Sequence, residues 1–247
     1  MNAELINGWW MTTDTHLGTS DTSGVTDKQI HNAQKVYAFF RARGWSLSAI
    51  AGMLGNFMVE SFMSPAYIQG TNRDRLPNGA ASLSDVPNSV MINFYKEYYS
   101  DPERNYGVGI AQWDGYTDLG LPHGQKLVSY AIRNNWNWYD GETQMNRIIF
   151  EKDGGWQWEV HQIQGIQWTW DNFPTNDRTP EISAYIWSAC YESADIGTLP
   201  KRQANARYWY DYLEANPGFI PGDWFYYLFG KRKRGLKNVR RDYSRRL

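Results

Sequence analysis

The sequence predicts one mainly α-helical domain with a small β element, and three observations support this prediction. Apolar residues recur at helical spacing over two early stretches, 26–43 and 46–61, and over several later ones. The segment Tyr106–Trp113 carries two glycines and is bounded by turn residues, which favours a short strand or hairpin. Aromatic side chains make up 16% of the 247 residues, enough to fill a core and also to line a cleft.

The helical stretches begin at residues that cap helices well. Thr26 can cap the first helix and Ser46 the second. In the second helix, Gly52 and Gly55 leave a flat surface where another element can approach closely. The predicted helices cover approximately residues 26–43, 46–61, 89–100, 124–134, 142–153, 180–193 and 202–215.

Composition divides the chain into three parts. Residues 1–27 are predicted to be an N-terminal arm or linker, because 11–27 are rich in Thr, Ser, Asp and Gly with almost nothing to bury. Residues 28–230 form the predicted main domain. Residues 231–247 form a basic C-terminal tail of charge +8, which leaves −9 on the rest of a chain whose net charge is −1. Such a tail indicates a solvated end or a contact with an anionic surface or partner, whereas the acidic remainder disfavours nucleic-acid binding.

Composition also argues against several classes of protein. No window approaches the roughly 18 apolar residues that cross a bilayer, and the N-terminus lacks the pattern of a signal peptide, so we expect no membrane span and no export signal. The single cysteine, Cys190, and four scattered histidines predict no disulfide, no metal site and no cofactor. A cysteine amidase using Cys190 and His161 is disfavoured, because Ile186–Tyr191 has the pattern of a packed helix.

Glu60 is the residue whose position most favours catalysis. It lies near the C-terminus of the predicted helix 46–61, among apolar neighbours. The negative end of the helix dipole and an apolar surrounding both favour the protonated carboxyl group. Glu60 therefore has the character of a general acid, although a solvated glutamate in a last helical turn is also common.

The segment 107–113 supplies the groups that a sugar site needs. In glycoside hydrolysis, one carboxyl group protonates the leaving oxygen while a second carboxylate or a held water acts at the cation-like carbon. Gly107 and Gly109 would let the backbone approach a sugar, while Gln112 and Trp113 would offer amide hydrogen bonds and a stacking face. The segment lacks the third glycine of a dinucleotide-binding motif, which excludes that function.

Four ordered blocks extend this reading to most of the chain. The blocks are Gly52–Asn56 with Glu60–Ser61, Tyr106–Trp113, Ala184–Glu192 and Arg202–Tyr210. Together, over roughly residues 28–214, they resemble the lysozyme-like domain of bacteriophage tail proteins. The resemblance implies a helical domain with a small β-hairpin lobe that flanks an active-site cleft. It also implies that Glu60 is the catalytic glutamate and that Gly109, Gln112 and Trp113 belong to a substrate-binding hairpin.

The second catalytic group is left open by the sequence. Asp74, Asp85, Asp114 and Asp118 are the candidate carboxylates. If none of them faces Glu60, the protein is expected to use Glu60 alone, as lytic transglycosylases do, and to form an anhydro sugar. Glu192 repeats the Glu-Ser pair of the active-site helix and is interpreted as a structural or supporting acid.

The resulting hypothesis is a bacteriophage hydrolase of peptidoglycan glycan strands. It would cleave the β-1,4 bond between N-acetylmuramic acid and N-acetylglucosamine during cell-wall penetration or lysis. Its expected location is the tail tip of the virion or the host cell wall, and its expected partners are peptidoglycan and other phage tail proteins. The alternatives are a lytic transglycosylase of the same fold and a non-catalytic virion protein that binds the wall.

Overall fold

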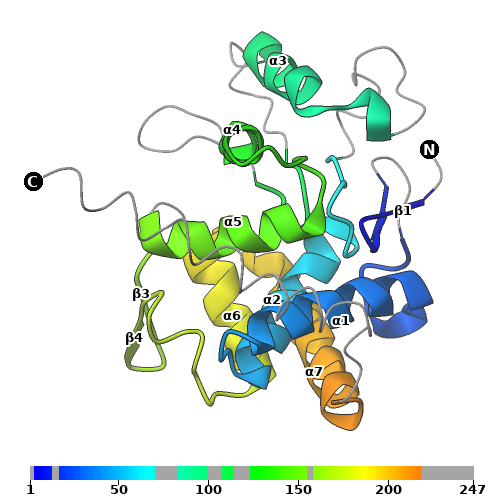
Figure 1. Cartoon of the computed structure of the whole chain (residues 1–247). Helices are drawn as coiled ribbons and strands as arrows, with labels where there is room; N and C mark the ends of the chain where they lie inside the picture. The colour runs from blue at the N-terminus through cyan, green and yellow to red at the C-terminus, as the bar shows by residue number, and fades with distance from the viewer. Residues whose placement is uncertain are drawn as a thin grey trace, which may run out of the picture. The chain divides into compact units, whose positions relative to one another are not determined.

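The protein was analysed as a computed structural model, which describes residues 3–12, 17–69, 83–98, 107–113, 123–154 and 158–217. The described residues up to Ala215 form one compact unit (Figure 1). Its helices are α1 (Asp27–Arg41), α2 (Leu47–Ser61), α3 (Asn88–Tyr98), α4 (His123–Arg133), α5 (Gly141–Gly154), α6 (Pro180–Trp187) and α7 (Leu199–Ala215). The predicted mainly α fold is confirmed.

The remaining elements are short. Two antiparallel hairpins are formed by β1 (Glu4–Ile6) with β2 (Trp9–Met11), and by β3 (His161–Ile163) with β4 (Ile166–Trp168). The π-helical turn η5 (Ser188–Glu192) continues directly from α6, and single 3-10 turns are η1 (Thr22–Gly24), η4 (Leu83–Asp85) and η6 (Ile196–Thr198).

Helix α2 is the central element, with α1, α6 and α7 packed around it (Figure 1). The two glycines of α2 permit this packing. A Cβ atom at Gly52 would lie 2.6 Å from the backbone of Ser183 in α6, and one at Gly55 would collide with the carbonyl oxygen of Arg202 in α7. The predicted flat surface on this helix is therefore confirmed, and it brings α7 against the C-terminal half of α2.

Capping fixes both ends of α2. The Ser46 side chain accepts a hydrogen bond from the Ala49 amide at the start of the helix. At the other end, Phe62 adopts a left-handed conformation (φ 54°) and its amide donates to the Phe57 carbonyl. A left-handed phenylalanine is uncommon, because this backbone conformation brings the Cβ atom of an L-residue close to a carbonyl oxygen. The turn ends the helix at Ser61 and leaves Glu60 in the last turn.

The N-terminal stretch is more buried than its composition predicts. Trp9 and Met11 of β2 are fully buried, and the Trp9 ring lies so close to Gly141 that a Cβ atom there would collide with it. Thr12 is also buried, and its amide and carbonyl both bond the Ser64 hydroxyl at 2.9 Å. The expectation that 11–27 bury almost nothing is therefore wrong for Met11, Thr12 and Leu17. The predicted basic tail, 231–247, lies outside the described residues.

Aromatic rings from the segments that flank β3–β4 pack against rings of α6 and η5. The Trp187 and Tyr191 ring centroids lie 4.3 Å apart, and those of Trp158 and Trp170 lie 4.8 Å apart and are stacked. The aromatic residues were expected both to fill a core and to line a cleft. Trp138, Tyr139, Trp168 and Trp170 are buried, as the first role requires, whereas Trp136 is exposed. In the described part of the chain, no helix combines the length and apolar character that a membrane span requires.

Candidate active site

A cavity of about 290 Å³ opens beside Glu60. Three segments contribute to it: the end of α2, the turn that follows, and the loop 107–113. Its lining residues are Val59, Glu60, Phe62, Tyr67, Gln69 and Gln112. The structure thus brings together the glutamate and the glutamine that the sequence singled out from two distant segments.

The loop 107–113 is a tight turn fastened to residues 67–69. Val108 and Trp113 pair through both backbone hydrogen bonds, and Val108 also pairs with Ile68. The Gly109 amide donates to the Tyr67 carbonyl at 2.9 Å, and Gly109 has a φ of +80° that favours glycine. The predicted short hairpin is present, and its position beside the end of α2 follows from these hydrogen bonds.

The two glycines of this loop have a packing role in the structure. Both are buried, and a Cβ atom at Gly107 would lie 2.6 Å from the side-chain oxygen of Gln112. A Cβ atom at Gly109 would lie 2.9 Å from the side chain of Gln144 in α5. The structure thus shows close packing of both glycines against protein side chains, while the predicted approach of a sugar to this backbone stays a prediction.

Gln144 is a supporting residue that sequence reasoning missed. Its side-chain nitrogen donates to the carbonyls of Pro65 at 2.6 Å and Trp138 at 2.8 Å, and its oxygen accepts from the Ile110 amide at 2.8 Å. This buried carboxamide ties the two walls of the cavity to α5. A glutamine in a helix carries no sequence signal for such a role, because two of its partners, Pro65 and Ile110, are distant in sequence.

Trp113 has a different environment from the one expected. Its side chain is only 1% exposed, and its indole N–H donates to the Tyr191 hydroxyl at 3.1 Å. That hydroxyl in turn donates to Glu151, and burial raises the pKa of Tyr191 well above its ordinary range. The expected sugar-stacking face on Trp113 is wrong for this structure, because the ring is enclosed by the core. The aromatic rings at the cavity are those of Phe62 and Tyr67, with centroids 5.4 Å apart.

Gln112 lines the cavity but is also held by its own loop. Its side-chain nitrogen donates to the Gly109 carbonyl at 2.7 Å and to the Tyr67 carbonyl at 3.2 Å. The side chain is therefore fixed in orientation at the edge of the cavity, which is what a group that positions a ligand requires.

The carboxylate of Glu60 contacts a cation that the sequence did not predict. Its side chain is 24% exposed, and one oxygen accepts a hydrogen bond from Nη2 of Arg202, whose side chain is 3% exposed. The sequence predicted apolar neighbours for Glu60, but its neighbours also include this buried arginine. Arg202 stands in one of the four blocks that carry the family resemblance, but 142 residues separate it from Glu60, so no local pattern pairs them.

Arg202 joins Glu60 to a second carboxylate. Its Nη1 donates to Glu192 at 2.6 Å and to Asn56 at 2.7 Å, and its Nε donates to Thr198 at 2.9 Å. The other oxygen of Glu192 accepts from the Trp187 indole at 2.9 Å. Burial raises the pKa of Glu192 to about 8, because Arg202 only partly offsets the loss of solvation and Glu60 adds repulsion.

Of the four aspartates proposed as a second catalytic group, the structure describes Asp85. Asp85 is exposed in η4 and does not line the cavity beside Glu60. Asp74, Asp114 and Asp118 lie outside the described residues. Within the described ranges, no group of three or more His, Cys, Asp or Glu side chains is arranged to hold a metal ion.

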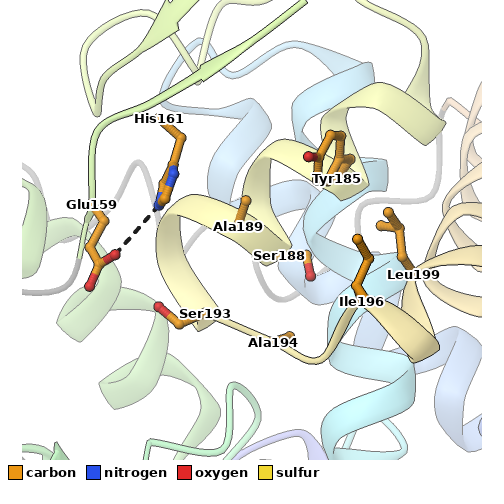
Figure 2. A pocket seen from close by; sticks show the side chains of 9 residues that line it. All are labelled: Glu159, His161, Tyr185, Ser188, Ala189, Ser193, Ala194, Ile196 and Leu199. Carbon is orange, nitrogen blue, oxygen red and sulfur yellow. Dashed lines mark ion pairs between the residues drawn. The ribbon is translucent and has the colours of Figure 1, made fainter.

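A second cavity, of about 310 Å³, lies on the outer side of η5 (Figure 2). In it, His161 faces Glu159, with 3.4 Å between Nε2 and the carboxylate oxygen. Cys190 is fully buried and does not line this cavity, and burial raises its pKa to about 11. A thiol with a raised pKa is a poor nucleophile, so the structure gives no support to a cysteine amidase.

Comparison with known proteins places this geometry in a family. The model of the phage tail lysozyme family matches residues 31–213. Morphogenesis protein 1 of Bacillus phage B103 is 28% identical over 182 residues, which cover 74% of this chain and 39% of that protein. The chain therefore spans about two-fifths of the length of this relative.

These findings agree with the resemblance found from the four sequence blocks, which covered nearly the same residues. They support a peptidoglycan-related function in a phage and a virion-associated location. By the extent of the match, the chain belongs to the phage tail lysozyme family.

Proposed function

We propose that the protein cleaves the glycan strands of bacterial peptidoglycan, with Glu60 as the general acid. The bond cleaved would be the β-1,4 bond between N-acetylmuramic acid and N-acetylglucosamine. The observation that supports this most directly is a partly exposed carboxylate at the wall of a cavity, next to two side-chain amides, in a chain of the phage tail lysozyme family.

The cavity has the chemistry that sugars require. Sugar rings present hydroxyl and acetamido groups that bond neutral amides, and they pack their C–H faces on aromatic rings. Gln69 and Gln112 supply the amides, while Phe62 and Tyr67 supply the aromatic wall. Among the described residues that line the cavity, Glu60 alone is charged, which suits the uncharged backbone of a glycan strand.

In the proposed reaction, Glu60 gives its proton to the glycosidic oxygen as the bond to the sugar carbon breaks. Water then adds at the cation-like carbon, and Glu60 recovers a proton. A second carboxylate would hold this water or stabilise the cation, and Asp74, Asp114 and Asp118 remain the candidates, since Asp85 does not line the cavity. The catalytic domain proposed from the sequence, residues 28–230, would act from the virion tail during wall penetration, or during lysis.

The test is digestion of purified peptidoglycan followed by mass spectrometry of the products. Glu60→Gln should release at least 100-fold less soluble product than the wild type, because general acid catalysis contributes about 10²–10⁴-fold. Glu159→Gln is a matched control, since Glu159 is an exposed glutamate of the second cavity, and it should be as active as the wild type.

The product masses separate hydrolysis from its alternative. Hydrolysis gains one water for each bond cut and leaves ordinary reducing ends, whereas a lytic transglycosylase leaves 1,6-anhydro ends. Glu60→Gln activity within tenfold of the wild type would contradict the acid role of Glu60. Anhydro ends would keep Glu60 as the acid and contradict hydrolysis.

A non-catalytic wall-binding virion protein is the second candidate, because the Bacillus phage relative carries the name of a morphogenesis protein. On that alternative, wild type and Glu60→Gln would sediment equally with cell-wall sacculi, and neither would release soluble product. Release by the wild type alone would exclude it.

A further inference from the structure

Behind the catalytic candidate lies a second carboxylate that the proposed reaction does not yet use. Glu192 is buried with a side chain only 4% exposed, and it reaches Glu60 through a shared partner, Arg202. It ends η5, where a π-helical turn replaces the regular continuation of α6. Single π-helical turns inside helices are frequent at functional sites.

The hydrogen bonds around Arg202 hold it in one place. Nη1 bonds both Glu192 and Asn56, and Nε bonds Thr198, so three of its hydrogen bonds go to residues that do not line the cavity. Asn56 is itself fixed, because its amide donates to the carbonyls of Gly52 at 2.9 Å and Ala184 at 3.1 Å. The guanidinium group is therefore anchored from behind and presents only Nη2 to Glu60.

The charges of this cluster do not balance without a proton. Two carboxylates face one guanidinium group, and in the described part of the chain these are the charged groups that act on Glu192: Arg202 from α7 and Glu60 from α2. One added proton makes the cluster neutral, which is the favourable state for groups withdrawn from water. Two strongly interacting carboxyl groups take up such a proton as a pair.

We propose that Glu192 is a positioning residue that lets Glu60 carry the catalytic proton, by neutralising Arg202 whenever Glu60 is protonated. This inference rests on the proposed function of Glu60. In one arrangement Glu192 holds the proton and Glu60 pairs with Arg202. In the other, one proton has left Glu192 and one has bound Glu60, while Arg202 pairs with Glu192. The net charge of the cluster is the same in both.

Removing the charge of Glu192 should therefore change the pH dependence of the reaction. In Glu192→Gln, Arg202 keeps Glu60 as its remaining carboxylate partner within this cluster, and protonating Glu60 then leaves a buried cation without an anion. The ionised form of Glu60 is favoured and the acid is lost at lower pH.

We expect the alkaline limb of the rate–pH profile of Glu192→Gln to move down by at least one pH unit. At pH 7 its rate should be at least tenfold below the wild type, and the deficit should shrink at pH 5. The measurement is the initial rate of soluble product release from purified peptidoglycan between pH 4 and 9.

Glu181→Gln is the matched control. Glu181 belongs to α6, which leads directly into the η5 turn that carries Glu192, and it likewise bonds an arginine of α7, Arg207, at 2.7 Å and 3.0 Å. It shares no partner with Glu60, so its alkaline limb should coincide with that of the wild type. A general loosening of the contact between α6 and α7 would affect both variants alike.

A double variant tests the electrostatic argument directly. In Glu192→Gln with Arg202→Gln, the cation that favours ionised Glu60 is gone, so the alkaline limb should return towards higher pH even if the maximum rate falls. If Glu192→Gln does not fold, Glu192→Asp withdraws the carboxylate by one methylene and should shift the limb in the same direction.

The outcomes separate this inference from the function on which it rests. A loss of rate in Glu192→Gln by the same factor at every pH would show a structural role and overturn the positioning role. Activity of Glu60→Gln close to that of the wild type would instead overturn the proposed function itself. An inactive Glu60→Gln together with an unshifted limb in Glu192→Gln overturns only the inference made here.

Discussion

Two arginines of α7 bind carboxylates from the preceding helical segment, but in opposite surroundings. The side chain of Arg202 is 3% exposed and that of its partner Glu192 is 4% exposed, whereas the values for Arg207 and Glu181 are 44% and 32%. Burial raises the pKa of Glu192. At Glu181 the smaller burial is outweighed by the hydrogen bonds from Arg207 and other groups, so its pKa is lowered.

The difference shows that exposure to solvent, and not the pairing itself, decides in which direction the pKa of the paired carboxyl group moves. A charge withdrawn from water depends on its partner, and removing that partner leaves an uncompensated buried charge. An exposed pair loses little when it is broken, because water replaces the missing partner. Glu60 belongs both to the Arg202 cluster and to the cavity lining. The loss of a charged partner in the cluster should therefore also affect the candidate active site.

The largest expected effect is the loss of Arg202. Arg202→Gln leaves Glu60 and Glu192 facing each other without a cation, and it should lower the free energy of unfolding by about 3–5 kcal/mol. Urea denaturation followed by tryptophan fluorescence would measure it, with Arg207→Gln as the matched variant on the same helix. Equal losses in the two variants would break the comparison between buried and exposed pairs.

The pH dependence of stability should reveal the proton held by Glu192. The pKa of Glu192 is raised from 4.5 to about 8, so between these pH values the folded protein binds more protons than the unfolded chain. Stability therefore falls as pH rises through this window. Thermal unfolding at pH 5, 6, 7 and 8 should show a falling Tm in the wild type and a flatter profile in Glu192→Gln.

The variant Glu181→Gln again serves as the control, because the pKa of Glu181 is lowered and its titration lies below this window. It should keep the wild-type slope between pH 5 and 8. An identical slope in wild type and Glu192→Gln would mean that Glu192 does not hold a proton in the folded protein.

Helix caps and helix glycines are local signals, and they predicted the position and the packing of α2 from the sequence. Thr26 and Ser46 cap α1 and α2 as expected. Glu60 lies at the cavity in the last turn of α2, which ends at the left-handed Phe62. Gly52 and Gly55 predicted the close packing of α2, because a missing side chain is visible in the sequence itself. The hairpin β3–β4 was missed, since strands of three residues are too short to show alternation.

Side-chain partners could not be predicted in the same way. The sequence around Trp113 shows an aromatic residue after a turn, but it does not show which way the ring points. In the structure, the indole is buried against Glu151 of α5 and Tyr191 of η5. Arg202 has the ordinary helical position of a surface arginine, and its burial follows from the contact of α7 with α2. Long-range contacts therefore decide which polar residues belong to the site.

The smallest expected effect concerns the exposed pair itself. Arg207 bonds Glu181 through two nitrogens and also lies 3.5 Å from Asp211, one turn further along α7. A bidentate contact improves the geometry of an ion pair, yet exposed pairs contribute about 0–1 kcal/mol, because water competes for both groups and two long side chains lose freedom.

Arg207→Gln should accordingly lower the free energy of unfolding by less than about 1 kcal/mol. This small loss should shrink further in 1 M salt, where the Debye length falls to about 3 Å and exposed charges are screened. Arg202→Gln should lose nearly as much stability in 1 M salt as in dilute buffer, because salt screens a buried cluster poorly. Urea denaturation of both variants at the two salt concentrations measures this contrast. If the loss of stability in Arg202→Gln depends on salt, water reaches the cluster. The cluster would then lack the buried environment that the proposed sharing of a proton between Glu60 and Glu192 requires.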